Sequence, residues 1–192
     1  MRRLLLFDID GTLVWGGPAK MAFEQAMLET FGTAGPIETH SFSGKTDPQI
    51  ARELLLDTGM ENGDIEAGFS ALWDRYTRYL EERLVSLPMD VLPGVAPLLE
   101  ALGSFDDVGL GLLTGNIVRG AELKLQSAGL GGHFRMGSYG SDHEERDELA
   151  EIAVRRARET WGVTFEPRDV LVVGDTPRDV QCGQAVGATT VA

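Results

Sequence analysis

Three short apolar runs in this sequence each end in polar side chains that are suited to binding a phosphate or a metal ion. In the order of the runs, these side chains are Asp8 and Asp10, then Thr114 and Asn116, then Asp175. A carboxylate that the backbone fixes at a strand end can attack phosphorus, so Asp8 is a candidate nucleophile. Each residue alone is also common in turns and caps. The indication of a binding site therefore comes from the three clusters together rather than from any one of them.

The apolar runs are typical of strands that are buried on both faces of a parallel sheet. They span residues 4–7, 108–113 and 170–173, and further strands are predicted over 134–139 and 189–191. From residue 89 onward, helical patterns alternate with these strands, which favours an α/β fold. Ligands of such sheets bind beyond the carboxyl ends of the strands, where the three polar clusters fall.

Between the first strand and the rest lies a stretch with helical character only. Apolar residues recur at three- and four-residue spacing around 21–31 and from Ile65 to Leu84. Another helix is predicted to start with Asp47 as N-cap and Pro48 at the first position. We therefore expect a doubly wound, Rossmann-like parallel-sheet core with an inserted all-helical cap. The core comprises residues 1–15 and 89–192, and the cap comprises residues 16–88.

The motifs resemble those of the haloacid dehalogenase superfamily. The sequence DIDGTL at 8–13 is similar to the family's first motif, TGN at 114–116 to the second and GDTPRD at 174–179 to the fourth. The resemblance covers essentially the whole chain. It is greatest to the phosphoglycolate-phosphatase-like branch, whose helical cap lies between the first and second motifs, where this chain has its helical stretch.

The resemblance implies a phosphatase that works through an aspartyl phosphate. Asp8 is then the nucleophile, and Asp10 is the general acid and base. The family also implies Mg²⁺, which prefers oxygen ligands, held here by the Asp8 and Asp175 carboxylates and the Asp10 backbone carbonyl. Thr114 and Gly115 would bind phosphate oxygens.

Other residues of the motifs leave alternatives open. Asn116 either orients the substrate or caps the following helix. Asp179 lies in the first turn of a helix that is predicted to begin with Thr176 as N-cap and Pro177, where the helix dipole favours a carboxylate. The family gives Asp179 a role at or next to the metal site.

The third motif departs from the family, which usually has a lysine there. Arg146 stands at the expected place, keeps the positive charge and can bind phosphate through two N–H groups. We assign it to phosphate binding, against the alternative of a surface arginine. Lys124 lies mid-helix between Leu123 and Leu125, a position that indicates a solvent-exposed face.

The predicted cap offers one candidate for substrate contact. Lys45 precedes a helix start, a position suited to an anionic or hydroxylated substrate, although the pattern is typical of an ordinary capping turn with an exposed lysine. Trp15 and Trp73 are interpreted as packing residues. The three histidines (His40, His133 and His143) are scattered and are expected at the surface, so they do not indicate a zinc site.

Composition narrows the classes of function. The formal net charge of −13 disfavours binding to nucleic acid or to acidic lipid surfaces. The single cysteine, Cys182, suits a reducing compartment, and no apolar run approaches the roughly 18 residues of a membrane helix. We expect a cytoplasmic protein, monomeric or a weak homodimer, that acts on a small phosphorylated metabolite.

Two other functions fit the same residues. One is a phosphosugar mutase of the same fold, in which Asp8 and Asp10 pass a phosphoryl group between hydroxyls. The other is a binding module for phosphate or a partner protein that has lost turnover, a possibility raised by the missing third-motif lysine. The chain also ends at Ala192, directly after a predicted strand. Relatives usually continue, so we expect either a shortened C-terminus or a sheet that ends early.

Overall fold

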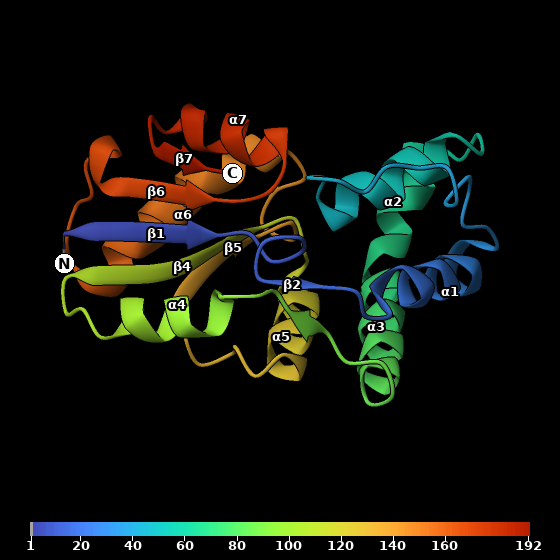
Figure 1. Cartoon of the computed structure of the whole chain (residues 1–192). Helices are drawn as coiled ribbons and strands as arrows, with labels where there is room; N and C mark the ends of the chain where they lie inside the picture. The colour runs from blue at the N-terminus through green and yellow to red at the C-terminus, as the bar shows by residue number, and fades with distance from the viewer. Residues whose placement is uncertain (1) are drawn as a thin grey trace.

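The computed structural model describes residues 2–192 and contains a five-stranded parallel sheet with the order β5-β4-β1-β6-β7. The strands are β1 (Arg3–Phe7), β4 (Val108–Thr114), β5 (Met136–Tyr139), β6 (Val170–Val173) and β7 (Thr189–Val191). The labelled strand arrows of β1, β4 and β6 run toward the helices drawn on the right (Figure 1). The carboxyl ends of these three strands therefore face the same side of the molecule.

Helices cover both faces of the sheet, because a parallel sheet is apolar on both sides. The covering elements are α4 (Val95–Gly103), α5 (Val118–Ser127), α6 (Arg146–Trp161), the 3₁₀ helix η1 (Pro167–Asp169) and α7 (Pro177–Ala185). Successive side chains of β1 point to opposite faces of the sheet, so the core has two parts. Leu4 and Leu6 pack with α6 and α7, whereas Phe7 packs with α4 and α5. The predicted doubly wound α/β fold is confirmed.

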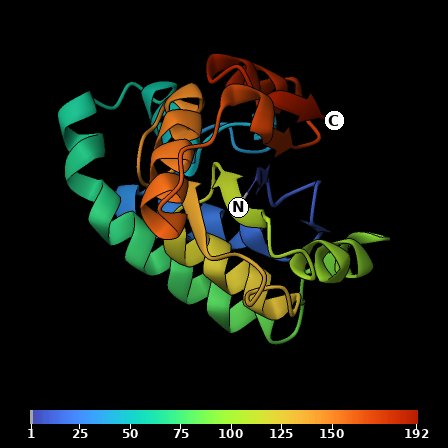
Figure 2. The same cartoon turned by 90° about the vertical axis from the view of Figure 1, so that its left-hand side faces the viewer.

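Three helices stand beyond the carboxyl ends of the strands. They are α1 (Ala19–Phe31), α2 (Asp47–Leu56) and α3 (Asn62–Leu84). The chain enters and leaves this group through two short antiparallel strands, β2 (Val14–Trp15) and β3 (Asp90–Val91). Viewed from the sheet side, α3 runs beside α5 (Figure 2). The division into core and cap domains stays an interpretation of this arrangement.

The start of α2 differs by one residue from the prediction. Thr46 is the N-cap, and its hydroxyl accepts a hydrogen bond from the Gln49 amide at 3.2 Å, so Asp47 is the first helical residue and Pro48 the second. Both threonine and aspartate cap helices well, and proline is tolerated anywhere in the first turn. The predicted start of α7 is confirmed, with Thr176 as N-cap and Pro177 first.

The first turn of α2 lies against the loop that follows β4. The Asp47 amide donates to the Gly115 carbonyl at 2.8 Å, and the Asp47 carboxylate accepts from the Ile117 amide at 2.9 Å. A side chain at Gly115 would meet the Lys45 carbonyl oxygen at 2.2 Å, so this approach requires glycine. These contacts hold the three helices close to the sheet edge.

The two tryptophans that were expected to pack behave differently. Trp73 lies against Phe69 and Phe23 among the α1 and α3 side chains. The packing interpretation is wrong for Trp15, which is 59% exposed, because the two-residue strand β2 points its second side chain outward. No helix within residues 2–192 has the length and apolar character needed to cross a membrane.

Adjacent leucines on α4 test the assignment of the core. Leu99 is fully buried and Leu98 is 47% exposed. We expect Leu99→Ala to lower the free energy of unfolding by about 2–5 kcal/mol, because it leaves a cavity in the core. Leu98→Ala on the same helix should change it by no more than about 0.5 kcal/mol. Urea unfolding of both variants measures the difference, and equal losses would contradict this core.

Candidate active site

The ends of β1 and β6 bring Asp8 and Asp175 together. The Asp8 amide donates to the Val173 carbonyl at 2.9 Å, which continues the strand pairing to the first residue after β1. Gly11, at φ +83°, then turns the chain. A side chain at Gly11 would meet the Asp175 carboxylate at 2.3 Å, so only glycine allows this close approach.

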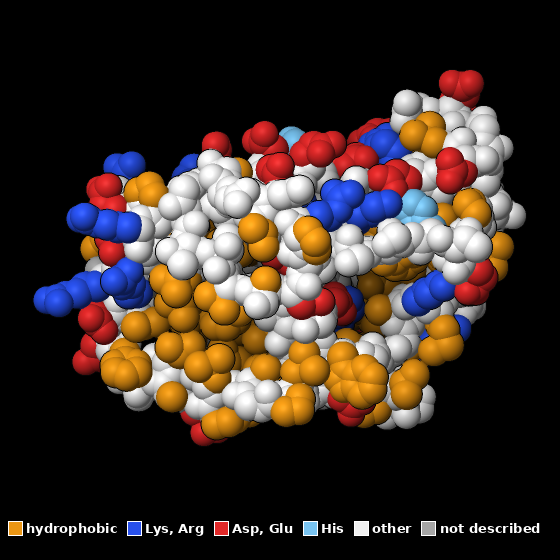
Figure 3. All heavy atoms as spheres, turned by 45° about the horizontal axis from the view of Figure 1, so that its top comes forward, with side chains coloured by type: hydrophobic (Ala, Val, Ile, Leu, Met, Phe, Trp, Pro, Cys, Tyr) orange, Lys and Arg blue, Asp and Glu red, His pale blue; other side chains and the backbone are white. Residues whose placement is uncertain are grey.

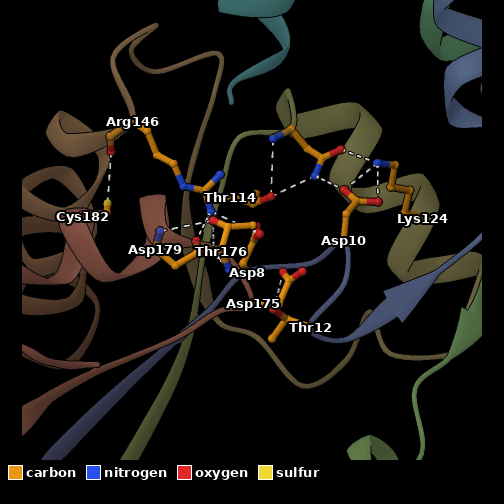
Figure 4. Close-up of polar contacts among 11 residues, drawn as sticks. Asp8, Asp10, Thr12, Thr114, Lys124, Arg146, Asp175, Thr176, Asp179 and Cys182 are labelled. Carbon is orange, nitrogen blue, oxygen red and sulfur yellow. Dashed lines mark hydrogen bonds and ion pairs between the residues drawn. The ribbon is translucent and has the colours of Figure 1, made fainter. Parts of the chain in front are cut away.

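Arg146 lies between Asp8 and Asp179 in the interior of the protein (Figure 4). Its Nη2 is 3.2 Å from Asp8 Oδ2 and donates a hydrogen bond to Asp179 Oδ1. All three side chains are buried, and the Arg146 Nε has no hydrogen-bond partner among residues 2–192. Arg146 is thus not a surface arginine.

Burial sets the protonation of this group. It raises the pKa of Asp8 to about 6, against the opposing effect of Arg146 and with further upward effects of Asp179 and Asp10. Burial lowers the pKa of Arg146, but the charges of Asp8 and Asp179 outweigh this and raise it above its usual value. The guanidinium therefore stays charged beside its two carboxylates.

Both carboxylate oxygens of Asp179 accept hydrogen bonds from neighbouring residues. Oδ2 accepts hydrogen bonds from the Thr176 amide at 2.9 Å and from the Thr176 hydroxyl at 2.6 Å, which forms the capping box of α7. Oδ1 accepts from Arg146. Because the capping box fixes the Asp179 side chain, its bond to Arg146 also fixes the position of the guanidinium.

Three carboxylates gather closely enough to hold a cation. One oxygen each of Asp8, Asp175 and Asp179 lies within 4.8 Å of the others. Asp179 is engaged by its own neighbours, and Asp175 is exposed, with Thr12 Oγ1 donating to its Oδ1 at 3.3 Å. Asp8 and Asp175 are therefore the side chains best placed as ligands, and an all-oxygen set suits a small hard cation.

Asp10 points away from Asp8 and toward α5 (Figure 4). Lys124 Nζ donates to both of its oxygens, at 2.8 and 2.7 Å, and Asn116 Nδ2 donates to Oδ2 at 2.7 Å. Partial desolvation raises the pKa of Asp10, whose side chain is 47% exposed, but the charge and hydrogen bonds of Lys124 outweigh it and lower the pKa below its usual value. These contacts favour the carboxylate form.

The prediction that Lys124 lies on a solvent-exposed face is wrong. Its side chain is 5% exposed, and Nζ also donates to Asn116 Oδ1 at 2.6 Å. The apolar neighbours Leu123 and Leu125 are buried too, because α3 covers the side of α5 that an isolated sheet would leave open. The sequence contained one signal for a buried Lys124. Side chains of a helix lean toward its N-terminus, and α5 begins beside the second motif.

The second motif is tied to Asp10 and to Lys124 of α5, and it does not cap that helix. Asn116 bonds Asp10, Lys124 and the Thr114 hydroxyl, and α5 has no side-chain cap, so the capping alternative for Asn116 is wrong. Thr114 is fully buried beneath Asn116. Gly115 and Asn116 line the cavity at the strand ends.

This cavity has a volume of about 410 Å³ and lies between the strand ends and the helices α1–α3. Charged and apolar side chains meet in the hollow between the two parts of the molecule (Figure 3). Lys45 lines it from the α2 side. Its Nζ donates to Glu53 Oε2 at 2.5 Å and lies 3.2 Å from His40 Nε2. The surface prediction for His40 is wrong, since its side chain is only 12% exposed.

Comparison with known proteins places this geometry in a family. The model of the haloacid dehalogenase-like hydrolases matches residues 3–187. The chain belongs to this family. The phosphoglycolate phosphatase of Synechococcus elongatus is 31% identical over 98% of this chain and 82% of its own length. The N-acetylmuramic acid 6-phosphate phosphatase of Pseudomonas aeruginosa is 28% identical over 99% of this chain and 80% of its own.

Solved structures agree on the fold. A hydrolase from Pseudomonas syringae has a TM-score of 0.69 at 20% identity and covers 99% of this chain and 83% of its own. CbbY from Rhodobacter sphaeroides, in complex with phosphate, has a TM-score of 0.64 at 19% identity, and the match covers 99% of this chain and 85% of the CbbY chain. At such identities the likeness concerns the fold alone.

The haloacid dehalogenase-like protein is thus a hydrolase of phosphate monoesters, of the phosphoglycolate phosphatase type. Phosphatases of this family generally use a divalent metal ion, and the cluster of Asp8 with Asp175 can hold one. The expected family, fold and enzyme class are confirmed. The roles of individual site residues stay predictions.

Removing Arg146 tests whether it holds the buried carboxylates together. We expect Arg146→Ala to lower the free energy of unfolding by about 3–5 kcal/mol, since it leaves two buried carboxylates without their cation. Arg155 is exposed on the same helix, and Arg155→Ala should stay within about 0.5 kcal/mol of the wild type. Urea unfolding at neutral pH compares them, and an unchanged Arg146→Ala protein would refute the assignment.

Proposed function

We propose that the protein is a Mg²⁺-dependent phosphatase that hydrolyses a small phosphorylated metabolite through an aspartyl phosphate on Asp8. One observation carries the proposal. Asp8 lies at the carboxyl end of the central strand, 3.2 Å from a buried guanidinium and close to a second carboxylate, Asp175. A nucleophilic carboxylate, a fixed cation and an acidic cation site are what phosphoryl transfer requires.

The proposed reaction has two steps. In the first, an Asp8 oxygen bonds to phosphorus, the ester P–O bond breaks, and Asp10 gives its proton to the leaving alcohol. In the second, Asp10 takes a proton from water, whose oxygen attacks phosphorus, and the Asp8–phosphorus bond breaks. Inorganic phosphate and the free Asp8 carboxylate result.

The contacts of Asp10 affect both of these reaction steps. Lys124 and Asn116 hold its carboxylate form, which is the form that the second step requires of a base. The first step requires the protonated acid nearer to the ester oxygen. Asp10 therefore has to leave its hydrogen bonds with Lys124 when substrate binds, by a side-chain rotation at the turn after β1.

Arg146 and the second motif supply phosphate binding in this proposal. The guanidinium lies beside the proposed nucleophile, Asp179 fixes its orientation, and its buried Nε has no hydrogen-bond partner within residues 2–192. Thr114, Gly115 and Asn116 lie at the end of β4, next to Asp10. An arginine at this place keeps the charge that the family usually supplies by lysine.

The Mg²⁺ ion fits the donors that the chain offers. Asp8, Asp175 and the Asp10 carbonyl would hold it, with Asp179 acting through Arg146. When bound, the ion would polarise the phosphoryl group and reduce repulsion between the phosphate and Asp8. Three carboxylates near one buried arginine leave the site with excess negative charge, which a divalent cation offsets.

On the cap side, Lys45 is the proposed contact to the substrate, because it lines the cavity opposite the strand ends.

A phosphosugar mutase remains the second chemistry that this fold performs, but no contact among residues 2–192 favours it over hydrolysis. A mutase would need a bisphosphate primer for turnover. A non-catalytic module is disfavoured by Arg146, which supplies the charge at the third motif.

The setting follows from general properties of the chain. We place it in the cytoplasm as a monomer or weak homodimer, because Cys182 is buried and unpaired in residues 2–192 and the net charge of −13 favours solubility. The same charge disfavours nucleic acid and acidic membranes as partners.

Hydrolysis of 4-nitrophenyl phosphate tests the proposed function. We expect release of nitrophenol with Mg²⁺, loss of release with EDTA, and recovery when Mg²⁺ is restored. Asp8→Asn should lower kcat by at least about a thousandfold, because the amide cannot act as nucleophile. Asp106→Asn, an exposed aspartate away from the site, is the matched control and should retain activity.

Circular dichroism has to show that Asp8→Asn is folded. Equal activity of the folded Asp8→Asn protein and the wild type would disprove a nucleophilic Asp8. Full activity of metal-stripped protein in EDTA would disprove the requirement for Mg²⁺.

A further inference from the structure

Lys124 uses every hydrogen-bond donor that it has. An ammonium carries three N–H groups. Nζ donates to Asp10 Oδ1 at 2.8 Å, to Asp10 Oδ2 at 2.7 Å and to Asn116 Oδ1 at 2.6 Å. When Asp10 turns toward a substrate, as the proposed reaction requires, two of these acceptors leave a side chain that is only 5% exposed. A buried ammonium without a carboxylate is unfavourable, so the turn of Asp10 requires a replacement partner.

Asp47 has the chemistry and the place of that partner. It is the first residue of α2, and it lines the same cavity as Asp10 and Lys124. Its Oδ2 accepts a hydrogen bond from the Ile117 amide at 2.9 Å, whereas its Oδ1 accepts none from the described part of the chain. One oxygen of the Asp47 carboxylate is therefore available to the Lys124 ammonium.

The charges of Asp10, Asp47 and Lys124 act on one another. Burial raises the pKa of Asp47 to about 6, with Lys124 and the Ile117 amide opposing the rise and Asp10 adding to it. Because this pKa lies below neutral pH, Asp47 is mainly a carboxylate there. Tyr76 is buried beside the same group, and burial together with the charges of Asp47 and Asp10 raises its pKa. Two carboxylates thus lie near one lysine, which bonds only Asp10.

We propose that Lys124 is a positioning residue that exchanges Asp10 for Asp47 when substrate binds, and so releases Asp10 to protonate the leaving group. The proposal rests on the proposed phosphatase function, in which Asp10 is the acid. The exchange breaks the two hydrogen bonds of Lys124 with Asp10 and forms one with Asp47 Oδ1, while the bond to Asn116 is kept. The Asp47 amide, which donates to the Gly115 carbonyl at 2.8 Å, holds the new partner in place.

Two substrates separate the release of Asp10 from the rest of the site. Phenyl phosphate and 4-nitrophenyl phosphate are similar in size, but phenolate is the poorer leaving group and depends more on protonation by Asp10. We define the leaving-group ratio as kcat/KM for phenyl phosphate divided by kcat/KM for 4-nitrophenyl phosphate. Asp10→Asn calibrates it and should lower the ratio by about tenfold or more. A variant that merely loosens the site lowers both values and leaves the ratio unchanged.

Asp47→Asn removes the replacement charge. Its amide oxygen can still accept from Ile117, so α2 should keep its place. We expect the leaving-group ratio to fall by about fivefold or more, because Lys124 then retains Asp10. Asp64→Asn, which changes the exposed first-turn aspartate of α3, is the matched control and should leave the ratio unchanged. An unchanged ratio in Asp47→Asn that circular dichroism shows to be folded would overturn the proposal.

A variant without the lysine tests whether Asp47 acts through Lys124. Methionine has a similar length and no charge. Adding Asp47→Asn to Lys124→Met should change the leaving-group ratio by less than about twofold, because the route is already removed. A further fall as large as that of Asp47→Asn alone would show that Asp47 acts independently, and would overturn the exchange. Lys124→Gln, which keeps a donor for Asn116, is the second background should Lys124→Met not fold.

The outcomes distinguish this inference from the function on which it rests. If 4-nitrophenyl phosphate is not hydrolysed in an Asp8-dependent manner, both are refuted. If it is hydrolysed and Asp10→Asn leaves the leaving-group ratio unchanged, the acid role of Asp10 fails and the exchange fails with it. If Asp10→Asn lowers the ratio and Asp47→Asn does not, only the exchange is refuted.

Discussion

The site depends on one buried guanidinium shared by two carboxylates. Arg146 touches Asp8 from the end of the central strand and Asp179 from the first turn of α7. Without a cation between them, two carboxylates in a buried space would repel and take up a proton. With it, the end of β1 and the starts of α6 and α7 are held in one arrangement. The pair of carboxylates that could hold a metal ion, Asp8 and Asp175, depends on that arrangement.

A second cation does the same on the other side of the site. Lys124 holds Asp10 and Asn116 together, and so links the turn after β1 to the end of β4. The two cations keep Asp8 and Asp10 apart, each with its own partner, although only Ile9 separates them. Opposite environments shift the pKa of Asp8 upward and that of Asp10 downward. The proposed mechanism requires the reverse order, an ionised Asp8 as nucleophile and a protonated Asp10 as acid, so ligand binding has to change both environments.

The sequence predicts the parts of the site that local chemistry determines. Asp8 follows a buried strand and Thr176 begins a helix, and both are visible as strand-end and capping patterns. Lys124 was mispredicted because its burial depends on α3, which packs on α5 from another part of the chain. The pairing of Lys45 with Glu53 is equally hidden, since Lys45 precedes α2 whereas Glu53 lies well inside it. Tertiary contacts, rather than residue types, decide both cases.

The central claim is that Asp8 carries the phosphoryl group during turnover. The most direct measurement is to quench the working enzyme with acid, reduce it with borohydride, and locate the change by peptide mass spectrometry. Borohydride converts an acyl phosphate of aspartate to homoserine and leaves a free carboxylate intact. The account predicts homoserine at position 8, dependent on substrate. Homoserine at another aspartate, or none at position 8 while substrate is being turned over, would contradict it.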